Sequence, residues 1–374
     1  MADTLYFSRD TKVFVEIGNA VWEIPVLDGF SFSQATNASE ITLNEMADGS
    51  GNSRRGRRMF NDSYAPAEWS FSTYARPFKS AGTNTTGNAS KDGTTRNHAV
   101  EECLWALMVG DASYTTPTDS VAPDFTGFTA DGTDLDIDFD SSNKTTLGTS
   151  NIYFQLGGAS AGNKTVYKIE GCVVNEASLD FDIDGIATIN WSGMGSLITE
   201  GAAAPTVTVN EAISSTSNFI RNRLTHLQLT TSDGGNHPSE YDLVLTGGNV
   251  TISNNITFLT PETLGVVNQP IGHVTGTRSV SGNFTCYLNS EDDSSAELFE
   301  NLIEDTSSIT NDFELVFFVG GESATPRIEL NMQSCHLEVP THSIDDIISL
   351  ETNFHALPST IEGTNELAIK YVGA

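Results

Sequence analysis

Two runs of alternating aspartates are the part of this sequence best suited to ion chemistry. Each run places an aspartate at every second position, with an apolar residue between. Because side chains alternate between the two faces of a β-strand, each run would gather its carboxylates on one face. Three interpretations are open: a calcium site, a solvated strand face, or an acidic wall lining a channel. The carboxylates are those of Asp134, Asp136, Asp138 and Asp140 in the first run and Asp180, Asp182 and Asp184 in the second.

The second run begins like a calcium-binding loop. The order Asp180-x-Asp182-x-Asp184-Gly185 matches the start of the motif D-x-[DN]-x-[DN]-G. That motif ends on a glutamate six residues after the glycine, and Trp191 stands at this position. The incomplete motif does not predict a metal site.

A basic cluster is the second charged feature. It consists of four arginines between a glycine-rich stretch and Met59-Phe60, which predicts a long exposed loop. On an acidic molecule, such a loop favours electrostatic contact with an acidic surface of a neighbouring identical subunit. Nucleic-acid binding is the alternative, and the surrounding negative charge weakens it. The four residues are Arg54, Arg55, Arg57 and Arg58.

No catalytic motif emerges from the sequence. A phosphate-binding GxxxxGK[ST] loop, an HExxH pair and a dinucleotide fingerprint are all absent from the sequence. The seven histidines are scattered, and the four cysteines are far apart with no CxxC pair. We therefore expect neither catalytic nor metal-binding residues, no cofactor, and buried free thiols.

The charge balance limits the possible partners. Eighteen basic and 49 acidic residues give a net charge of −31. A chain this acidic repels nucleic acid, so sequence-specific binding of DNA or RNA is not expected. The first residues lack the basic and apolar regions of a secretory signal, and no apolar stretch approaches the length of a membrane span.

Alternating patterns dominate the chain and predict a mostly β fold. Large apolar and small polar residues alternate in Phe30–Ser33 and in Trp69–Tyr74, as expected of strands with one buried face. Helical spacing of apolar residues occurs in only two segments, His98–Met108 and Ser295–Ile303. We therefore predict a β-rich protein with one short helix in each half.

An internal repeat indicates two similar units. Cys172 and Cys335 lie 163 positions apart, and so do Asp182 and Asp345. The order of predicted elements is the same in both halves, which favours duplication over chance. We predict one domain over residues 1–200, with long insertions at 79–97 and 111–163, and a second over residues 201–374.

The first part of the chain resembles the opening of bacteriophage tail tube proteins. The resemblance runs through Val21–Gln34, Thr42–Met46, Arg54-Arg55-Gly56 and Pro66–Tyr74, and continues into the predicted helix His98–Met108. It covers residues 1–110 clearly and the predicted hairpin 166–192 in pattern. Its length, rather than any single motif, makes it specific.

The resemblance implies a fold and an assembly. Each domain would be a β-sandwich of two nearly orthogonal sheets flanked by a helix, and sheets of neighbouring subunits would join into the inner β-barrel of a ring. Rings would stack into a tube with an acidic lumen that DNA crosses on ejection, without specific binding. The basic loop would lie in the region that contacts a neighbouring ring or subunit, and Asp180, Asp182 and Asp184 would line part of the lumen.

The doubled domain changes the expected stoichiometry. Three chains would supply the six domains of a ring, so we expect trimeric, pseudo-hexameric rings, with hexameric rings as the alternative. The implied location is the virion tail, assembled in the host cytoplasm, and further implied partners are sheath, baseplate and tail terminator proteins. The alternative function is that of a soluble β-sandwich that binds carbohydrate or a protein partner.

Overall fold

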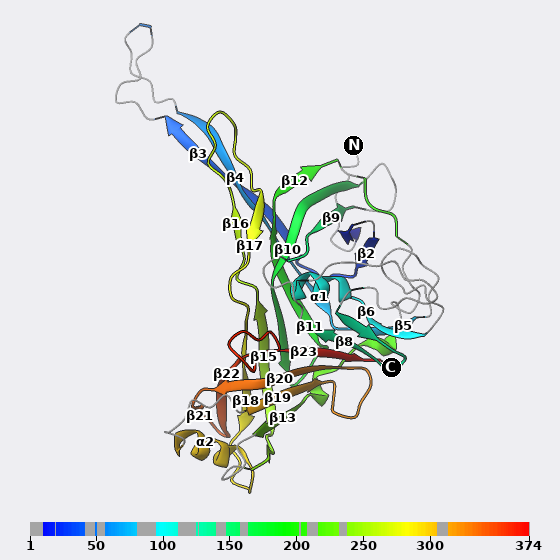
Figure 1. Cartoon of the computed structure of the whole chain (residues 1–374), viewed down its shortest axis with the longest axis vertical. Helices are drawn as coiled ribbons and strands as arrows, with labels where there is room; N and C mark the ends of the chain where they lie inside the picture. Colours follow the sequence, from blue (N-terminus) through cyan, green and yellow to red (C-terminus); the bar gives the residue numbers. More distant parts are fainter. Residues whose placement is uncertain are drawn as a thin grey trace.

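Within the residues that the structure describes, the fold is mostly β, with two short α-helices, as the sequence predicts. The computed structural model describes residues 10–18, 20–41, 49–50, 57–80, 95–110, 125, 127–139, 147–157, 164–201, 203–207, 216–231, 238–304 and 313–373. Figure 1 shows an elongated molecule, in which a long hairpin projects from the body at one end and α2 lies at the other.

The first half contains one α-helix and two main groups of strands. In chain order its elements are β1 (Lys12–Ile17), β2 (Ala20–Ile24), β3 (Ser31–Ile41), β4 (Arg58–Tyr74), β5 (Pro77–Ser80), β6 (Arg96–Ala99), α1 (Glu102–Val109), β7 (Phe128–Ala130), β8 (Asp134–Asp138), β9 (Ser150–Leu156), β10 (Thr165–Asp182), β11 (Thr188–Gly195) and β12 (Leu197–Glu200).

The second half follows two short 3-10 turns at Thr216–Asn218 and Asn222–Leu224. Its elements are β13 (His226–Thr231), β14 (Glu240–Tyr241), β15 (Leu245–Ser253), β16 (Thr257–Leu259), β17 (Gly272–Val274), β18 (Ser279–Tyr287), α2 (Ser295–Glu304), β19 (Phe313–Val319), β20 (Arg327–Leu337), β21 (Thr341–Ile344), β22 (Ile348–Ala356) and β23 (Ala368–Val372).

The two halves share one plan of strand pairing. In the first half, the antiparallel pairings β1–β2, β1–β9, β9–β10, β10–β12, β10–β11, β11–β4 and β4–β3 form two sheets that share β10. The second half repeats them in the same order as β13–β14, β13–β19, β19–β20, β20–β23, β20–β22, β22–β18 and β18–β15. Each pairing in the first series therefore has a counterpart in the second.

Matched hydrogen bonds fix how the two series correspond. The thiol of Cys172 donates to Ile169 O, and the thiol of Cys335 donates to Met332 O, which supports the spacing of 163 at these strands. Beyond the cysteines the spacing changes. After β10 the sequence reads Ile183-Asp184-Gly185-Ile186, and from the last residue of β21 it reads Ile344-Asp345-Asp346-Ile347, a spacing of 161. Asp345 thus corresponds to Asp184 and not to Asp182, because the second copy has two fewer residues before the turn.

Backbone pairing joins the two halves into one sheet. The C-terminal part of β10 pairs with β15 from Glu176↔Ser253 to Asp182↔Gly247. The sheet therefore runs β3-β4-β11-β10-β15-β18-β22 without a break. A second link is made by β8, which pairs with β23 near the C-terminus. Strand β9 lies between β1 and β10, as β19 lies between β13 and β20, so the predicted extra segment 111–163 contains a strand of the shared plan.

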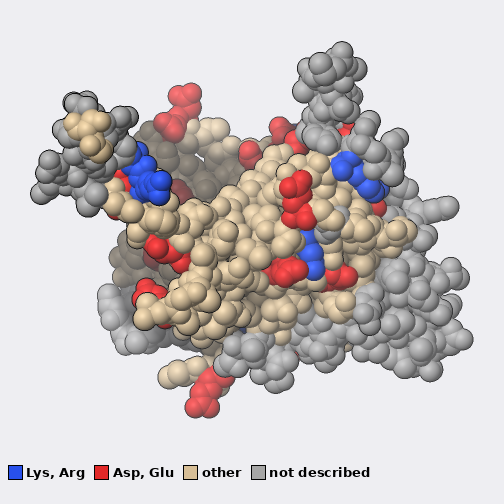
Figure 2. All heavy atoms as spheres, turned by 90° about the horizontal axis from the view of Figure 1, so that it is seen from above, with Lys and Arg blue, Asp and Glu red and all other residues tan. Residues whose placement is uncertain are grey.

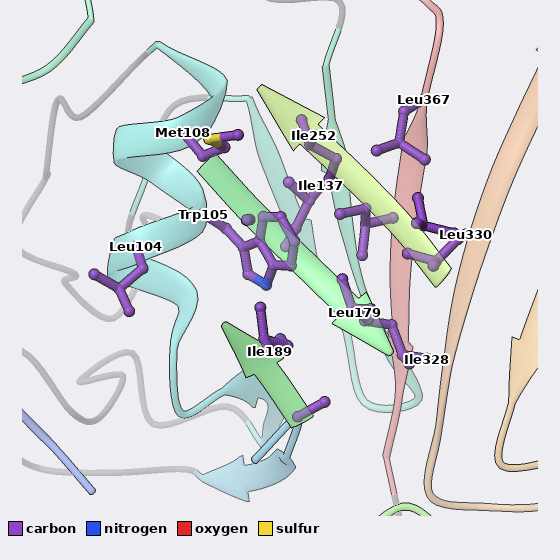
Figure 3. Packing of buried hydrophobic residues seen from close by; sticks show 14 of the residues in the cluster. Leu104, Trp105, Met108, Ile137, Leu179, Ile189, Ile252, Ile328, Leu330 and Leu367 are labelled. Atoms are coloured by element: carbon purple, nitrogen blue, oxygen red, sulfur yellow. The ribbon is translucent and has the colours of Figure 1, made fainter. Parts of the chain in front are cut away.

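One hydrophobic core spans both halves. The helix α1 is completely buried, and Figure 3 shows Trp105 and Met108 facing Leu179 and Ile252, with Leu330 and Leu367 of the second half beyond. The Trp105 ring meets the Trp191 ring edge to face, with centroids 4.7 Å apart. Burial of this many large apolar side chains is the main stabilising contribution to the fold.

The first predicted helix begins later than expected. Residues 96–99 form β6, which pairs with β5, so the helix starts at Glu102 instead of His98. It ends at Gly110, whose φ of 109° gives the left-handed cap that glycine favours. The second predicted helix, Ser295–Ile303, is confirmed as Ser295–Glu304.

A buried polar network ties α1 to the C-terminal strand. The Tyr371 hydroxyl donates to Glu101 Oε1 at 2.5 Å, and the Trp105 indole N–H donates to the Tyr371 oxygen at 2.7 Å. Burial raises the pKa of the Glu101 carboxyl to about 7, and the hydrogen bond from Tyr371 offsets this effect only in part. A neutral Glu101 is therefore the form that the folded state favours.

This network predicts pH-dependent stability. Because the pKa of Glu101 is raised in the folded state, the stabilising contribution of this residue to the free energy of unfolding depends on pH. It is fully present below the ordinary pKa of 4.5 and is lost as pH rises through about 7. Replacement Glu101→Gln keeps a neutral acceptor for Tyr371. We expect the variant to match the native chain below pH 4.5 and to exceed it at pH 8 by on the order of 3 kcal/mol in free energy of unfolding. Urea unfolding across this pH range measures the difference, with the exposed Glu351→Gln as control, and parallel curves for the native chain and Glu101→Gln would contradict it.

Candidate assembly surfaces

The continuous sheet has one apolar and one polar face. Along β4, Trp69 and Phe71 point into the core, while the alternate residues Ser70 and Ser72 point outward. The same alternation holds in the other strands, as expected of a sheet with one wet face. The outward positions hold mainly hydroxyl and amide side chains: Ser31, Ser33, Ser70, Ser72, Thr188, Asn190, Ser192, Ser178, Asn249, Thr251, Ser253, Ser281, Asn283, Thr285, Ser349 and Asn353.

The charges on this polar face are acidic. In the described strands β4 from Glu68 onward, β11, β10 from Glu176, β15 from Gly247, β18 and β22, no Lys or Arg occurs. Hydrogen bonds orient some of the carboxylates. The Asn190 amide donates to Asp180 Oδ2 at 3.0 Å, and the Asn283 amide donates to Glu351 Oε1 at 3.1 Å. The acidic residues of the face are Glu68, Glu176, Asp180, Asp182 and Glu351.

The structure separates the predicted aspartate ladder 180–184. Asp180 and Asp182 are exposed at alternate positions of β10, on the polar face. Asp184 lies beyond the end of the strand, in the turn before β11, where it pairs with Arg223 at 3.3 Å. The prediction that all three share one strand face is therefore wrong for Asp184, because the strand ends at Asp182.

The other ladder lies elsewhere. Asp134, Asp136 and Asp138 belong to β8, on the sheet that contains β23, and Asp140 lies outside the described residues. Lys370 of β23 reaches Asp136 at 3.2 Å and Asp134 at 3.7 Å, so a basic residue partly neutralises this ladder. Across the described part of the chain, no group of three His, Cys, Asp or Glu side chains is placed to hold a metal ion.

Two arms extend from the same end of the molecule. The outer parts of β3 and β4 form the first arm, and residues 254–278 with β16 and β17 form the second, beside it (Figure 1). Tyr64 N–H donates to Asn268 O at 2.9 Å, and Asn268 N–H donates to Asp62 O at 3.1 Å, which holds the arms together. The second arm comes from the connection between β15 and β18, which corresponds to the connection between β3 and β4.

Apolar side chains are exposed on both arms. They are large enough to bury considerable area against another surface, and such exposure is typical of an interaction site. The sequence patterns used above did not identify these residues, although apolar residues in a stretch with Gly and Pro would have been a signal. They are Ile41, Met59 and Phe60 on the first arm and Leu259, Leu264, Val266, Val267, Ile271 and Val274 on the second.

Part of the predicted basic loop is placed by the structure. Arg57 and Arg58 are exposed at the start of β4, on the first arm, and Arg57 lies 3.3 Å from Glu40 of β3. Arg54 and Arg55 lie outside the described residues. In Figure 2, which looks down on this end, basic side chains lie beside the arm at the left and also at the centre and upper right, while acidic side chains are spread over the face.

The sheet has two unpaired edges among the described strands. Strand β3 pairs only with β4, and β21 pairs only with β22. These are the positions that correspond to β15 and to the C-terminal part of β10, which pair with each other inside the chain. An unpaired edge offers backbone donors and acceptors to another strand.

Comparisons with known proteins agree with this architecture. A family model described as phage tail tube protein matches residues 67–356. The chain is also 31% identical to tail tube protein pb6 of Escherichia phage T5 over 378 aligned positions, which cover 97% of this chain and 75% of that protein. The chain therefore belongs to the phage tail tube protein family.

Family membership establishes the general role. The chain is a structural subunit of a phage tail tube, a component of the virion, and proteins of this kind self-assemble into a tube. None of the described helices is long and apolar enough to cross a membrane.

Proposed function

We propose that three copies of this chain close into a ring of pseudo-sixfold symmetry and that such rings stack into the tube. Each chain supplies two tube units, residues 1–200 and 201–374, and has a purely structural role without catalysis. The acidic polar face lines the bore through which DNA leaves the virion.

The doubled pairing plan is the observation that supports this proposal. Inside the chain, β10 of the first unit pairs with β15 of the second. The corresponding edges that remain unpaired among the described strands are β21 and β3. Pairing β21 of one copy with β3 of the next repeats the internal junction, so that the sheet closes on itself and leaves no exposed edge.

The polar face suits a wall along which DNA slides. Carboxylates such as Asp180 and Asp182 repel phosphate groups, and the hydroxyl and amide groups around them keep the wall hydrated. The absence of Lys and Arg from the described strands of this face removes the groups that would bind phosphate. The wall would therefore pass DNA without holding it.

The arms are suited to contacts between stacked rings. They project from one end only, and their exposed apolar side chains would be buried against the next ring. A contact between unlike surfaces generates an open stack rather than a closed pair. The arginines at the start of β4 would add attraction to the acidic surface of the neighbouring subunit.

The ring stoichiometry follows from this proposal. Electron microscopy of purified, assembled tubes should show three chains in each ring, with six similar densities around the bore. Masses of isolated rings should be three times that of the chain. Six chains in each ring would contradict the proposal.

The basic arm provides a second test. Reversal of two charges in Arg57→Glu/Arg58→Glu replaces attraction by repulsion at the proposed contact, while the exposed positions leave the fold intact. We expect the unassembled concentration at equilibrium to rise at least tenfold at low salt. Sedimentation of tubes measures it, with Lys12→Glu/Lys164→Glu as the matched control, since Lys12 is exposed and paired with Glu23 as Arg57 is with Glu40. Normal assembly of the arm variant would exclude this role.

The acidic wall can be tested by charge reversal on the polar face. In virions that carry Asp180→Lys/Asp182→Lys, we expect slower DNA ejection at low ionic strength and recovery as salt screens the new attraction. The control Glu291→Lys/Asp292→Lys makes the same charge change at exposed positions away from the polar face, before α2, and should eject normally. Time-resolved DNA release measures both variants, and equal rates for the two would place Asp180 and Asp182 away from the bore.

A further inference from the structure

The segment that leads into the second unit covers a turn of the first. Residues 219–223 lie against the turn between β10 and β11, where Ile186 and Arg221 form an antiparallel bridge. Ala187 N–H donates to Ile220 O at 2.9 Å, and Asn222 N–H donates to Gly185 O at 3.1 Å. This covering segment closes the junction between the two units from outside the sheet.

Side chains reinforce the same contact. The Phe219 ring meets the Tyr74 ring edge to face at 5.2 Å, and the Arg76 guanidinium lies 4.9 Å from the centre of the Phe219 ring. Arg223 pairs with Asp184 of the turn at 3.3 Å. Apolar, cation–π and ionic contacts therefore all fix the covering segment on the first unit.

The second unit has the same turn. Ala75 N–H donates to Ala187 O at 3.0 Å beside the first turn, and Leu288 N–H donates to Ile348 O at 2.9 Å beside the second. By this match, Asp345 corresponds to Asp184, and Tyr287, which ends β18, corresponds to Tyr74, which ends β4. The surface that receives the covering segment is thus present twice.

The second surface is exposed. Ile344 and Ile347 are 79% and 61% exposed, against 47% and 37% for the corresponding Ile183 and Ile186. Within the described residues no bridge to this turn corresponds to that of Ile186 with Arg221. We call this surface the lower patch, and its apolar members are Tyr287, Leu288, Ile344, Ile347 and Ile348.

The sequence before β1 parallels the covering segment before β13. Val13 and Val15 are fully buried in β1, as Leu227 and Leu229 are in β13, a spacing of 214. Counting back from these strands matches Thr11 with Thr225, Arg9 with Arg223 and Leu5 with Phe219. The segment Leu5-Tyr6-Phe7-Ser8-Arg9, which lies outside the described residues, therefore has the apolar residues and the arginine that the lower patch requires.

We propose that residues 5–9 of one copy bind the lower patch of the next copy in the ring, with Arg9 paired to Asp345. This inference rests on the proposed ring. The partner is a second copy because Figure 1 shows β2 and β9, the neighbours of β1, in the upper part of the body, well away from β21 near the lower end. The contact repeats between subunits what residues 219–223 do within one chain, and it locks each β21–β3 junction from outside the sheet.

Cross-linking tests the contact directly. All four native cysteines are buried, so they should not compete for a cross-linker. The variant Arg9→Cys/Asp345→Cys adds two thiols at the proposed contact. In assembled tubes, a short bis-maleimide should join chains into covalent species that end at three chains, the number in the proposed ring. Each single cysteine variant is the control. If tubes form normally but cross-link no more than the controls, this contact is wrong and the tube function is unaffected. A native chain that forms no tubes would instead contradict the tube function.

Charge exchange provides an independent measurement. We expect Arg9→Glu and Asp345→Lys each to raise the unassembled concentration about threefold, and the double exchange to restore it. Asp346→Lys is the matched control. Asp346 corresponds to Gly185, a residue without a side chain, so the contact in the first unit predicts no ion pair at this position. Circular dichroism of the unassembled chains separates misfolding from lost contact. Equal effects of Asp345→Lys and Asp346→Lys, or no rescue by the exchange, would overturn the pairing.

Discussion

Backbone pairing between β10 and β15 is the interaction on which the rest of the structure depends. It joins the two halves of the chain into one sheet, and by doing so it gives the chain one continuous polar face. Strand β10 is long enough to serve two sheets, since its first part pairs with β9 and β12 and its last part with β11 and β15. Backbone groups in a sheet need hydrogen-bond partners. The β10–β15 pairing supplies them inside the chain, whereas among the described strands the outer edges of β3 and β21 have no paired strand.

The buried helix shows how firmly the two units are joined. All residues of α1 are buried, and its Trp105 contacts Tyr371 from the opposite end of the chain. The helix α2 occupies the corresponding place between β18 and β19, but Ile303 near its end is half exposed. The difference follows from position, because α1 lies between two units of one chain and α2 lies at the outer end of the second unit.

The two halves of the chain differ in the arms that they bear. The first unit bears the long arm of β3 and β4, and the second bears the shorter arm of β16 and β17, which lies against it. A ring of identical single units would have to use one arm for every contact. Here the exposed apolar residues are divided between two arms that are held together by backbone hydrogen bonds of Asn268.

The sequence by itself determined the local periodicities, and it predicted two similar units. Alternation in Trp69–Tyr74 predicted a strand with one wet face, because this signal depends only on neighbouring residues. The matched cysteines predicted a repeat, because that signal depends only on residue types at a fixed spacing. Only the tertiary structure decided which aspartates share a surface. Asp182 ends its strand and Asp184 lies in a turn, while Asp134 and Asp136 face Lys370, a residue more than two hundred positions away. Contacts between distant segments carry no local signal, so the polar face and its unpaired edges emerge only from the folded chain.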